Sequence, residues 1–286
     1  MVKLGQEAGK WVICKPWCSV LGAPCVRYYT GIEPTVLLGT GSSLTISVII
    51  PAFNEAALLA DSLGSVRAAM KVFDELDWRS ELIVCDNNST DRTASIARAA
   101  GATVCAEPVN QIGRARNTGA AHATGDWLVF VDADSSPSAA LFAAVAETIL
   151  AGQCIAGGST VHLGGSHHWV VTLFTHVWNG LSRVTGWAPG SFIFCEASAF
   201  QAVGGFSQEL YAGEEIDLFR RFKRLARRHG RTIVILHKHP LETSDRKVHL
   251  YTLRELLPFL AATLLSRGRT LRSAQKCFAW YDGRRE

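Results

Sequence analysis

The feature that most constrains the fold is a regular alternation of strand-like and helix-like segments between residues 44 and 131. Four apolar segments have the composition of buried strands: 46–50, 81–86, 102–106 and 126–131. The segments between them have helical periodicity and predict helices that end near residues 73, 100 and 123. Strands joined by helices at this spacing form right-handed crossovers. The sequence therefore predicts an α/β fold with a mostly parallel central sheet and helices on both faces.

The second half of the chain has a less regular pattern. We expect helices at 137–151, 168–184 and 214–229, strands at 155–163 and 190–194, and a short helix that ends at Gly204-Gly205. On the helix at 168–184, helical spacing places Trp169, Leu173 and Val177 on one side.

Three regions are expected along the 286 residues. Residues 1–43 lack clear periodicity and end in the turn-rich stretch Gly-Thr-Gly-Ser-Ser, so we interpret them as an extension outside the core fold. Residues 44–250 form the α/β domain, and residues 251–286 form a C-terminal helical tail. No segment reaches the roughly 18 uninterrupted apolar residues that a membrane-spanning helix requires.

The composition favours a cytoplasmic globular protein. A net charge of +4 is too mild to indicate a nucleic-acid partner. The eight cysteines include no Cys-x-x-Cys pair, and four of them lie in apolar stretches that are typical of strands. This usage indicates buried, reduced thiols and not a disulfide framework.

Polar residues cluster where three of the predicted strands end. These clusters are Asn54-Glu55, Asp86-Asn87-Asn88 and Asp132-Ala133-Asp134. Ligands of parallel α/β sheets bind at the carboxyl ends of the strands, so the clusters predict one ligand site on that edge. Because side chains alternate along a strand, Asp132 and Asp134 can point the same way, one toward a metal and the other toward a ligand or its water. The same residues are also compatible with an ordinary strand-to-helix turn.

These residues resemble the family 2 glycosyltransferases of the GT-A fold, which transfer a sugar from a nucleotide donor to an acceptor. The resemblance covers about residues 44–248. It rests on five segments in the family's order: 48–55, 84–93, 115–120, Asp132-Ala133-Asp134, and Gly204-Gly205-Phe206 followed by 213–218. The resemblance implies a metal-dependent glycosyltransferase that inverts the anomeric carbon.

The resemblance also implies which residues bind the nucleotide-sugar. They are Pro51, Ala52, Phe53, Glu55, Asp86, Asn88, Arg114, Asn117, Asp132, Ala133 and Arg246. Asp86 would accept hydrogen bonds from the base, although an aspartate in this position is also typical of an Asx turn. Arg246 would stabilise the leaving diphosphate.

A divalent cation, Mg²⁺ or Mn²⁺, is the implied cofactor. Asp134 is the expected direct ligand, Asp132 would meet the ribose or a metal-bound water, and His239 is a candidate third ligand. Oxygen ligands suit such a hard cation, which neutralises charge on the departing nucleoside diphosphate.

The resemblance places the catalytic base at the start of a helix after a Gly-Gly-Phe turn. Glu215 matches by position, and Glu214 and Asp217 are rivals. The family usually has an aspartate where Glu215 stands. Adjacent carboxylates repel each other, which raises one pKa toward a useful range. Alternatively, the three carboxylates only favour the positive end of the helix dipole.

The sequence is compatible with alternative functions. A sugar-phosphate nucleotidyltransferase shares the sheet and metal site but typically has a glycine-rich loop, which Pro51–Glu55 lacks. A catalytically silent nucleotide-sugar-binding module is the second alternative.

The acceptor would be a small molecule, a glycan or a lipid-linked molecule. Six basic residues on the helix at 214–229 suggest peripheral contact with anionic lipid on the inner membrane face, or simply a solvated surface.

Overall fold

The computed structural model describes residues 5–7, 10–12, 44–164, 169–244, 266 and 269–277. The chain divides into two compact units, Met1–Ser42 and Ser43–Glu286. In the first unit, β1 (Gly5–Glu7) and β2 (Lys10–Val12) form an antiparallel pair. The expected boundary between a domain at 44–250 and a helical tail lies outside the described residues and stays a prediction.

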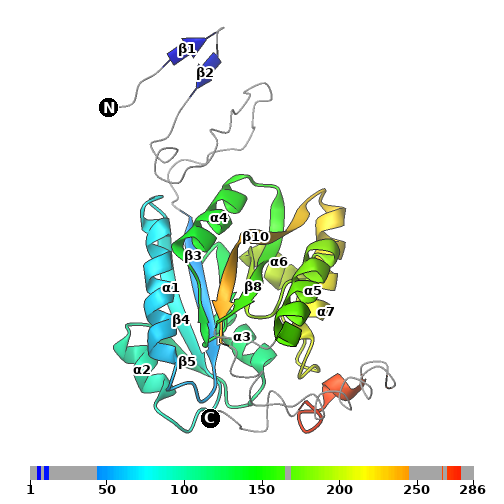
Figure 1. The fold of residues 1–286 in the computed structure, drawn as a ribbon. Helices are drawn as coiled ribbons and strands as arrows, with labels where there is room; N and C mark the ends of the chain where they lie inside the picture. The colour runs from blue at the N-terminus through cyan, green and yellow to red at the C-terminus, as the bar shows by residue number, and fades with distance from the viewer. Residues whose placement is uncertain are drawn as a thin grey trace. The chain divides into compact units, whose positions relative to one another are not determined.

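The alternating pattern of the first half folds as expected. Its strands are β3 (Thr45–Ala52), β4 (Arg79–Asp86), β5 (Thr103–Ala106) and β6 (Trp127–Val131). Its helices are α1 (Leu59–Asp74), α2 (Thr93–Ala99) and α3 (Ile112–Ala121). The four strands are parallel in the order β5-β4-β3-β6, because each helix carries the chain back to the start of the next strand (Figure 1).

The second half continues the same sheet with mixed strand directions. Its strands are β7 (Ser135–Ser136), β8 (Cys154–Leu163), β9 (Phe192–Glu196) and β10 (Thr232–Thr243). Its helices are α4 (Ala139–Leu150), α5 (Trp169–Thr185), α6 (Ala197–Val203), α7 (Glu214–Arg228) and the 3₁₀ helix η2 (Arg269–Arg272). β9 lies antiparallel between β6 and β8, β10 is parallel to β8, and β7 is antiparallel to β10.

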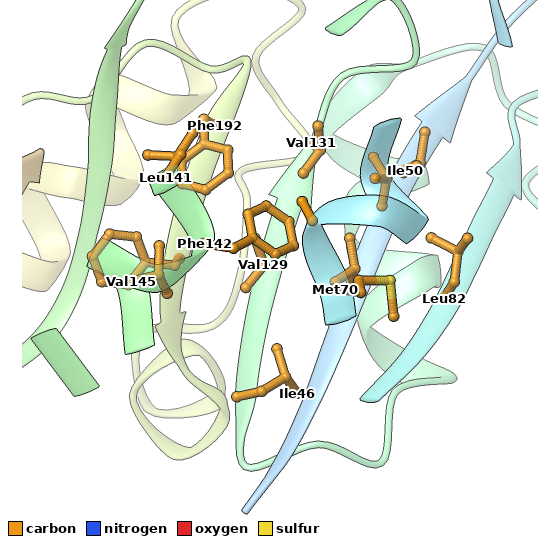
Figure 2. Packing of buried hydrophobic residues seen from close by; sticks show 14 of the residues in the cluster. Ile46, Ile50, Met70, Leu82, Val129, Val131, Leu141, Phe142, Val145 and Phe192 are labelled. Carbon is orange, nitrogen blue, oxygen red and sulfur yellow. The ribbon is translucent and has the colours of Figure 1, made fainter. Parts of the chain in front are cut away.

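Two apolar cores cover the two faces of the sheet. One joins α1 and α4 to β3 and β6 through Ile50, Val129 and Phe142, which Figure 2 shows at close range. The other packs α3, α6 and α7 against the opposite face through Phe130, Phe200 and Phe222. The helices therefore lie on both faces of the sheet, as the sequence predicts.

The turn after β6 differs from the expected geometry. The strand ends at Val131, and Asp132–Asp134 form a turn before the two-residue strand β7. The Ser135 backbone N–H donates to the Asp132 carbonyl at 3.1 Å. The alternation of a continuing strand therefore does not orient these two carboxylates. Ser138 then caps α4 by accepting a hydrogen bond from the Leu141 N–H at 3.1 Å.

The described cysteines have the burial expected from composition. Cys85, Cys105, Cys154, Cys195 and Cys277 are buried free thiols. Among the helices of the described parts of the chain, none combines the length and hydropathy needed to cross a bilayer.

Candidate active site

The loops that follow β3 and β4 are bound to each other at the carboxyl edge of the sheet. Asn54, at the end of β3, accepts a hydrogen bond at Oδ1 from the Thr90 N–H at 2.8 Å. Its own N–H donates to Ser89 Oγ at 2.9 Å. Asn54 adopts a positive φ of 51°, a conformation that asparagine tolerates better than most residues. We call these loops, residues 51–56 and 86–93, the donor rim.

Asp91 completes the donor rim. Its Oδ1 accepts hydrogen bonds from the Thr93 N–H at 2.9 Å and the Thr93 hydroxyl at 2.5 Å, and its Oδ2 accepts one from the Ala56 N–H at 3.0 Å. Although burial acts in the opposite direction, these hydrogen bonds lower the pKa of Asp91. Asp91 therefore joins the start of α2 to the loop that follows β3.

The predicted nucleotide-binding residues of the first half lie on this rim. Ala52 is directly opposite Asp86 in the β3–β4 register. Pro51, Ala52 and Glu55 are buried, whereas Phe53 and Asp86 are partly exposed. Asn88 is exposed with a positive φ of 65°. The structure thus brings these residues to one edge of the sheet.

A second cluster of charge lies beneath the Asp132–Asp134 turn, and its centre is Arg116 of α3. The guanidinium is 1% exposed. Its Nη2 pairs with Asp132 Oδ1 at 2.9 Å and donates to the Gly190 carbonyl at 2.8 Å. Its Nη1 pairs with Glu214 Oε1 at 2.7 Å. We call Arg116, Asp132, Gly190, Glu214 and Glu215 the charged junction.

Arg116 remains charged in this buried position. Burial alone would lower its pKa, but the carboxylates of Asp132, Glu214 and Glu215 raise it. The guanidinium carbon also lies 5.1 Å from the centre of the Phe206 ring, in cation–π range. One buried cation therefore connects the turn after β6 to the start of α7.

Glu215 lies beside the same guanidinium. A Cβ built on Gly190 would be 3.3 Å from Arg116 Nη2 and 3.7 Å from Glu215 Cγ. The Gly190 backbone therefore packs against both side chains. Burial, and then repulsion from Glu214, raises the pKa of Glu215 from 4.5 to about 8. Glu214 is buried in its ion pair, and Asp217 pairs with Arg221 at 2.8 Å. A carboxyl group with this raised pKa suits general-base chemistry near neutral pH.

Asp134 faces a different environment from Asp132. It lines an open cleft of about 220 Å³ together with Leu58, Asp61, Ser62, Ser136, Gly164, Glu242, Thr243 and Ser244. Its backbone carbonyl accepts a hydrogen bond from the Ser244 N–H at 3.1 Å. Asp132 is held by Arg116, whereas Asp134 borders the cleft.

The structure does not bring His239 to Asp134. His239 is exposed on β10, five residues before Ser244. It lies within a register irregularity, where β8 advances by only two residues while β10 advances from Leu236 to Leu241. In the described parts of the chain, no three His, Cys, Asp or Glu side chains are grouped so that they could hold a metal ion. Arg246 lies outside the described residues.

Two predicted residues on α3 make structural contacts. Arg114 donates from Nε to Gln111 Oε1 at 2.9 Å. Asn117 clamps the turn after α6, since its Nδ2 donates to the Phe206 carbonyl at 2.9 Å and its Oδ1 accepts from the Phe206 N–H at 2.8 Å. This clamp holds the Gly204-Gly205-Phe206 turn that precedes α7. Contact of either residue with a nucleotide-sugar stays a prediction.

Arg116 is the residue that sequence reasoning missed, although it lies within a segment that carries the resemblance. A signal for it exists in the spacing. Gly113, Arg116 and Gly119 are three residues apart, so they share one helical face, and two glycines mark that face as closely packed. All three are buried. An arginine between two glycines on a packed face is a candidate for buried ion pairs.

Comparison with known proteins identifies the class. The model of glycosyl transferase family 2 matches residues 47–202, so the chain belongs to this family. An uncharacterized glycosyltransferase of Mycobacterium tuberculosis is 30% identical over 133 residues, which are 46% of this chain and 56% of the relative. The 4,4'-diaponeurosporenoate glycosyltransferase of Staphylococcus haemolyticus is 39% identical over 97 residues, 32% of this chain and 24% of the relative. The chain thus spans about half or less of these relatives' length.

Solved structures of glycosyltransferases share the fold. Glucosyl-3-phosphoglycerate synthase from Mycobacterium tuberculosis, crystallised with Mn²⁺, UDP and phosphoglyceric acid, is 26% identical with a TM-score of 0.55 over 79% of this chain and 78% of its own. A mannosyltransferase from Pyrobaculum calidifontis, in complex with GDP-Man and Mn²⁺, is 18% identical with a TM-score of 0.58 over 83% of this chain and 65% of its own. The fold is that of the GT-A glycosyltransferases.

Proposed function

We propose that this chain transfers a sugar from a nucleoside-diphosphate donor to an acceptor hydroxyl, with a divalent cation and with inversion at the anomeric carbon. The observation that carries the proposal is the charged junction, in which Arg116 bonds to both Asp132 and Glu214. This arrangement fixes Asp132 relative to Glu214, which precedes the base candidate Glu215 on α7. Family membership and the 26% identical synthase crystallised with Mn²⁺ and UDP support the same reaction class.

The donor rim is the proposed nucleotide pocket. Asp86, opposite Ala52 in the sheet, would accept hydrogen bonds from the base, and the partly exposed Phe53 would lie against it. The backbones of Pro51 and Ala52 with Glu55 would complete the pocket. Asn54 and Asp91 accept hydrogen bonds from backbone N–H groups of the adjacent loop and so hold this rim in place before a ligand arrives, which reduces the ordering cost of binding.

The residues near the cleft fit a cation that is shared with the donor. Mg²⁺ usually binds through one or two carboxylates together with waters and substrate phosphates, and seldom through an all-protein cage. Asp134 at the cleft provides one such carboxylate, and the second oxygen of Asp132 is not engaged by Arg116. When bound, Mg²⁺ or Mn²⁺ would neutralise charge on the diphosphate. Arg246 is proposed to assist, as the resemblance implies.

Glu215 is the proposed base. It would accept the proton of the acceptor hydroxyl while that oxygen forms a bond to the anomeric carbon. The bond from that carbon to the diphosphate oxygen breaks in the same displacement, so its electron pair leaves with the nucleoside diphosphate. Glu214 keeps Arg116 in place and so supports this geometry. The buried free thiols are the ground for proposing a cytoplasmic location.

Donor turnover tests the proposal. Hydrolysis and binding are measured across UDP-, GDP- and dTDP-sugars with and without Mn²⁺. Asp134→Asn should lower Mn²⁺-dependent turnover by about a hundredfold or more, because it removes several kcal/mol of charge stabilisation. Asp74→Asn, a change of the same kind at an exposed position of α1, should turn over at close to the wild-type rate.

Three results would overturn the proposal or part of it. Failure to bind any nucleotide-sugar in any metal condition would exclude a transferase and a silent binding module alike. Binding without hydrolysis or transfer to any acceptor would favour the silent module. Formation of a nucleotide-sugar from a sugar phosphate and a nucleoside triphosphate would identify a nucleotidyltransferase.

A further inference from the structure

Helix α5 exposes apolar side chains to solvent. Leu173, Val177, Leu181 and Val184 are 54%, 61%, 44% and 87% exposed. Their spacing of four, four and three residues places them on one face of the helix. We call these four residues the apolar stripe. Scattered apolar residues are normal on a surface, but a continuous stripe along one helix typically marks an interaction site.

Two polar side chains on the opposite side of α5 bond to neighbouring segments. Asn179 donates from Nδ2 to the Val161 carbonyl at 2.8 Å and accepts at Oδ1 from the Val161 N–H at 3.1 Å. Ser182 is 1% exposed and donates to the Trp187 carbonyl at 2.7 Å. These bonds determine which face of the helix points inward. The apolar stripe therefore cannot turn toward the sheet without breaking them.

Helix α7 carries a basic face nearby. Arg220, Lys223, Arg224 and Arg227 follow the spacing of one helical side, and the three arginines are exposed. None of the four forms an ion pair with a carboxylate within the described part of the chain. Burial together with Arg227 and Arg220 lowers the pKa of Lys223, as expected in a cluster of uncompensated positive charge.

The apolar stripe and the basic face meet at Trp187. Arg220 Cζ lies 5.3 Å and Lys223 Nζ 5.4 Å from the centre of its ring, so both cations contact the segment that directly follows α5. Trp187 is three residues beyond Val184, the most exposed member of the stripe. α5 and α7 both contact β8 and β10. In Figure 1 both helices are drawn at that end of the sheet.

We infer that the apolar stripe and the basic face together form a docking surface for anionic lipid membranes. An apolar helix face beside clustered arginines is the pattern of interfacial helices, in which apolar side chains enter the headgroup region while cations meet anionic headgroups. A second copy of the chain fits this surface less well. A symmetric pair built on it would bring two uncompensated basic faces together. The inference is independent of the proposed reaction.

Vesicle co-sedimentation of the full chain tests the inference. The probe is vesicles of phosphatidylcholine with or without phosphatidylglycerol, at low and at high KCl. We expect binding to the anionic vesicles that decreases at high KCl as the charges are screened, and at least tenfold weaker binding to phosphatidylcholine alone. The double variant Leu173→Ser/Val177→Ser should weaken anionic binding by roughly tenfold or more. Arg224→Gln/Arg227→Gln should do the same and flatten the salt dependence.

Matched controls use surfaces elsewhere on the molecule. Val109→Ser/Leu150→Ser changes one valine and one leucine that are 43% and 60% exposed. Arg79→Gln/Arg98→Gln removes two exposed arginines of β4 and α2. Both controls should bind vesicles like the wild type, and thermal melts should show all four variants folded.

Three results would overturn the inference. The first is that the wild-type chain does not sediment with anionic vesicles at low salt, and the second is that the α5 and α7 variants bind as well as their controls. The third comes from sedimentation velocity without lipid. A dimer that Leu173→Ser/Val177→Ser converts to a monomer would identify the stripe as a protein–protein interface.

Discussion

The donor rim and the charged junction lie at the same edge of the sheet but are held together by different forces. In the rim, neutral side chains and Asp91 bond to backbone N–H groups of the adjacent loop. In the junction, three carboxylates surround one buried guanidinium. The rim is thus a set of small, separable contributions. The junction is a single unit in which the loss of one member leaves the others charged and buried.

The sizes of these contributions follow from solvent access. A hydrogen bond of the rim contributes about 1 kcal/mol to stability, because water would replace the lost partner. Removing one partner of a buried ion pair costs about 3–5 kcal/mol, because the remaining charge has no water to solvate it. Mutations at the junction should therefore affect folding and activity together, whereas mutations at the rim should affect folding only slightly.

The largest effect is expected from Arg116→Met. This change leaves Asp132 and Glu214 without their buried cation, so chemical denaturation should show a loss of about 3–5 kcal/mol of unfolding free energy. Sugar transfer should also be lost, because no side chain then bonds to both Asp132 and Glu214 and fixes their relative position. Activity is measured at a temperature where the variant remains folded by circular dichroism.

Arg114→Met is the matched control for stability. Arg114 lies on the same helix but is only half-buried, and its Nε bonds to Gln111. Its loss should cost about 1 kcal/mol or less. Equal destabilisation by the two variants would show that the buried ion pairs of Arg116 contribute no more to stability than the single hydrogen bond of Arg114.

The second prediction separates the base from its neighbours. Glu215→Gln should lower the transfer rate by about 10²–10⁴-fold, as expected for removal of a general base, while isothermal titration should show unchanged donor binding. The wild-type rate should increase with pH up to about 8, because Glu215 accepts a proton only when ionised.

Asp217→Asn is the matched change two residues beyond Glu215 on the same helix. Asp217 pairs with Arg221 and is not part of the Arg116 network, so this variant should keep most of the activity. A Glu215→Gln enzyme with the wild-type rate, or an inactive Asp217→Asn enzyme that still binds the donor, would assign the base elsewhere.

The third prediction concerns the close packing that positions Arg116. A Cβ on Gly119 would be 2.5 Å from Ile49 Cγ2, so Gly119→Ala should push α3 away from β3. Urea denaturation should show a loss of about 1–3 kcal/mol, as for other overpacked positions. Gly64→Ala on α1 is the control, since nothing lies within 4 Å of its new Cβ. It should stabilise the protein by about 0.5–1 kcal/mol through helix propensity, and loss of stability in both variants would contradict a packing origin.

The donor rim could be predicted from the sequence, and the charged junction could not. The rim follows from where apolar strands end. Asp86 is the last residue of β4, and Asp91 lies in the loop that follows it. The junction joins residues 16 and 98 positions apart, which no local pattern relates. Strand β10 was missed because His237–Pro240 are exposed and interrupt its alternation at a register irregularity. Helix α5 was predicted nearly to its ends, but periodicity alone cannot tell that its polar side faces inward.

The last prediction concerns opposite pH dependences of stability in the two regions. The pKa of Glu215 is raised in the folded state from 4.5 to about 8, so the folded protein binds the extra proton between these values. Its stabilising contribution is complete below pH 4.5 and is lost as pH rises through 8. The pKa of Asp91 is lowered, so its contribution is present above its ordinary value of 3.8 and is lost as pH falls through the folded value.

Denaturation midpoints measured between pH 3 and 9 should distinguish the two regions. Glu215→Gln should flatten the decline between pH 4.5 and 8 and leave the profile below pH 3.8 unchanged, because Asp91 titrates only at the acid end. Asp91→Asn should flatten the acid side alone, with a loss near neutral pH of about 1 kcal/mol from the weakened hydrogen bonds. If both variants alter the same side of the profile, the rim and the junction do not titrate independently. The two regions would then have to be treated as one electrostatic unit.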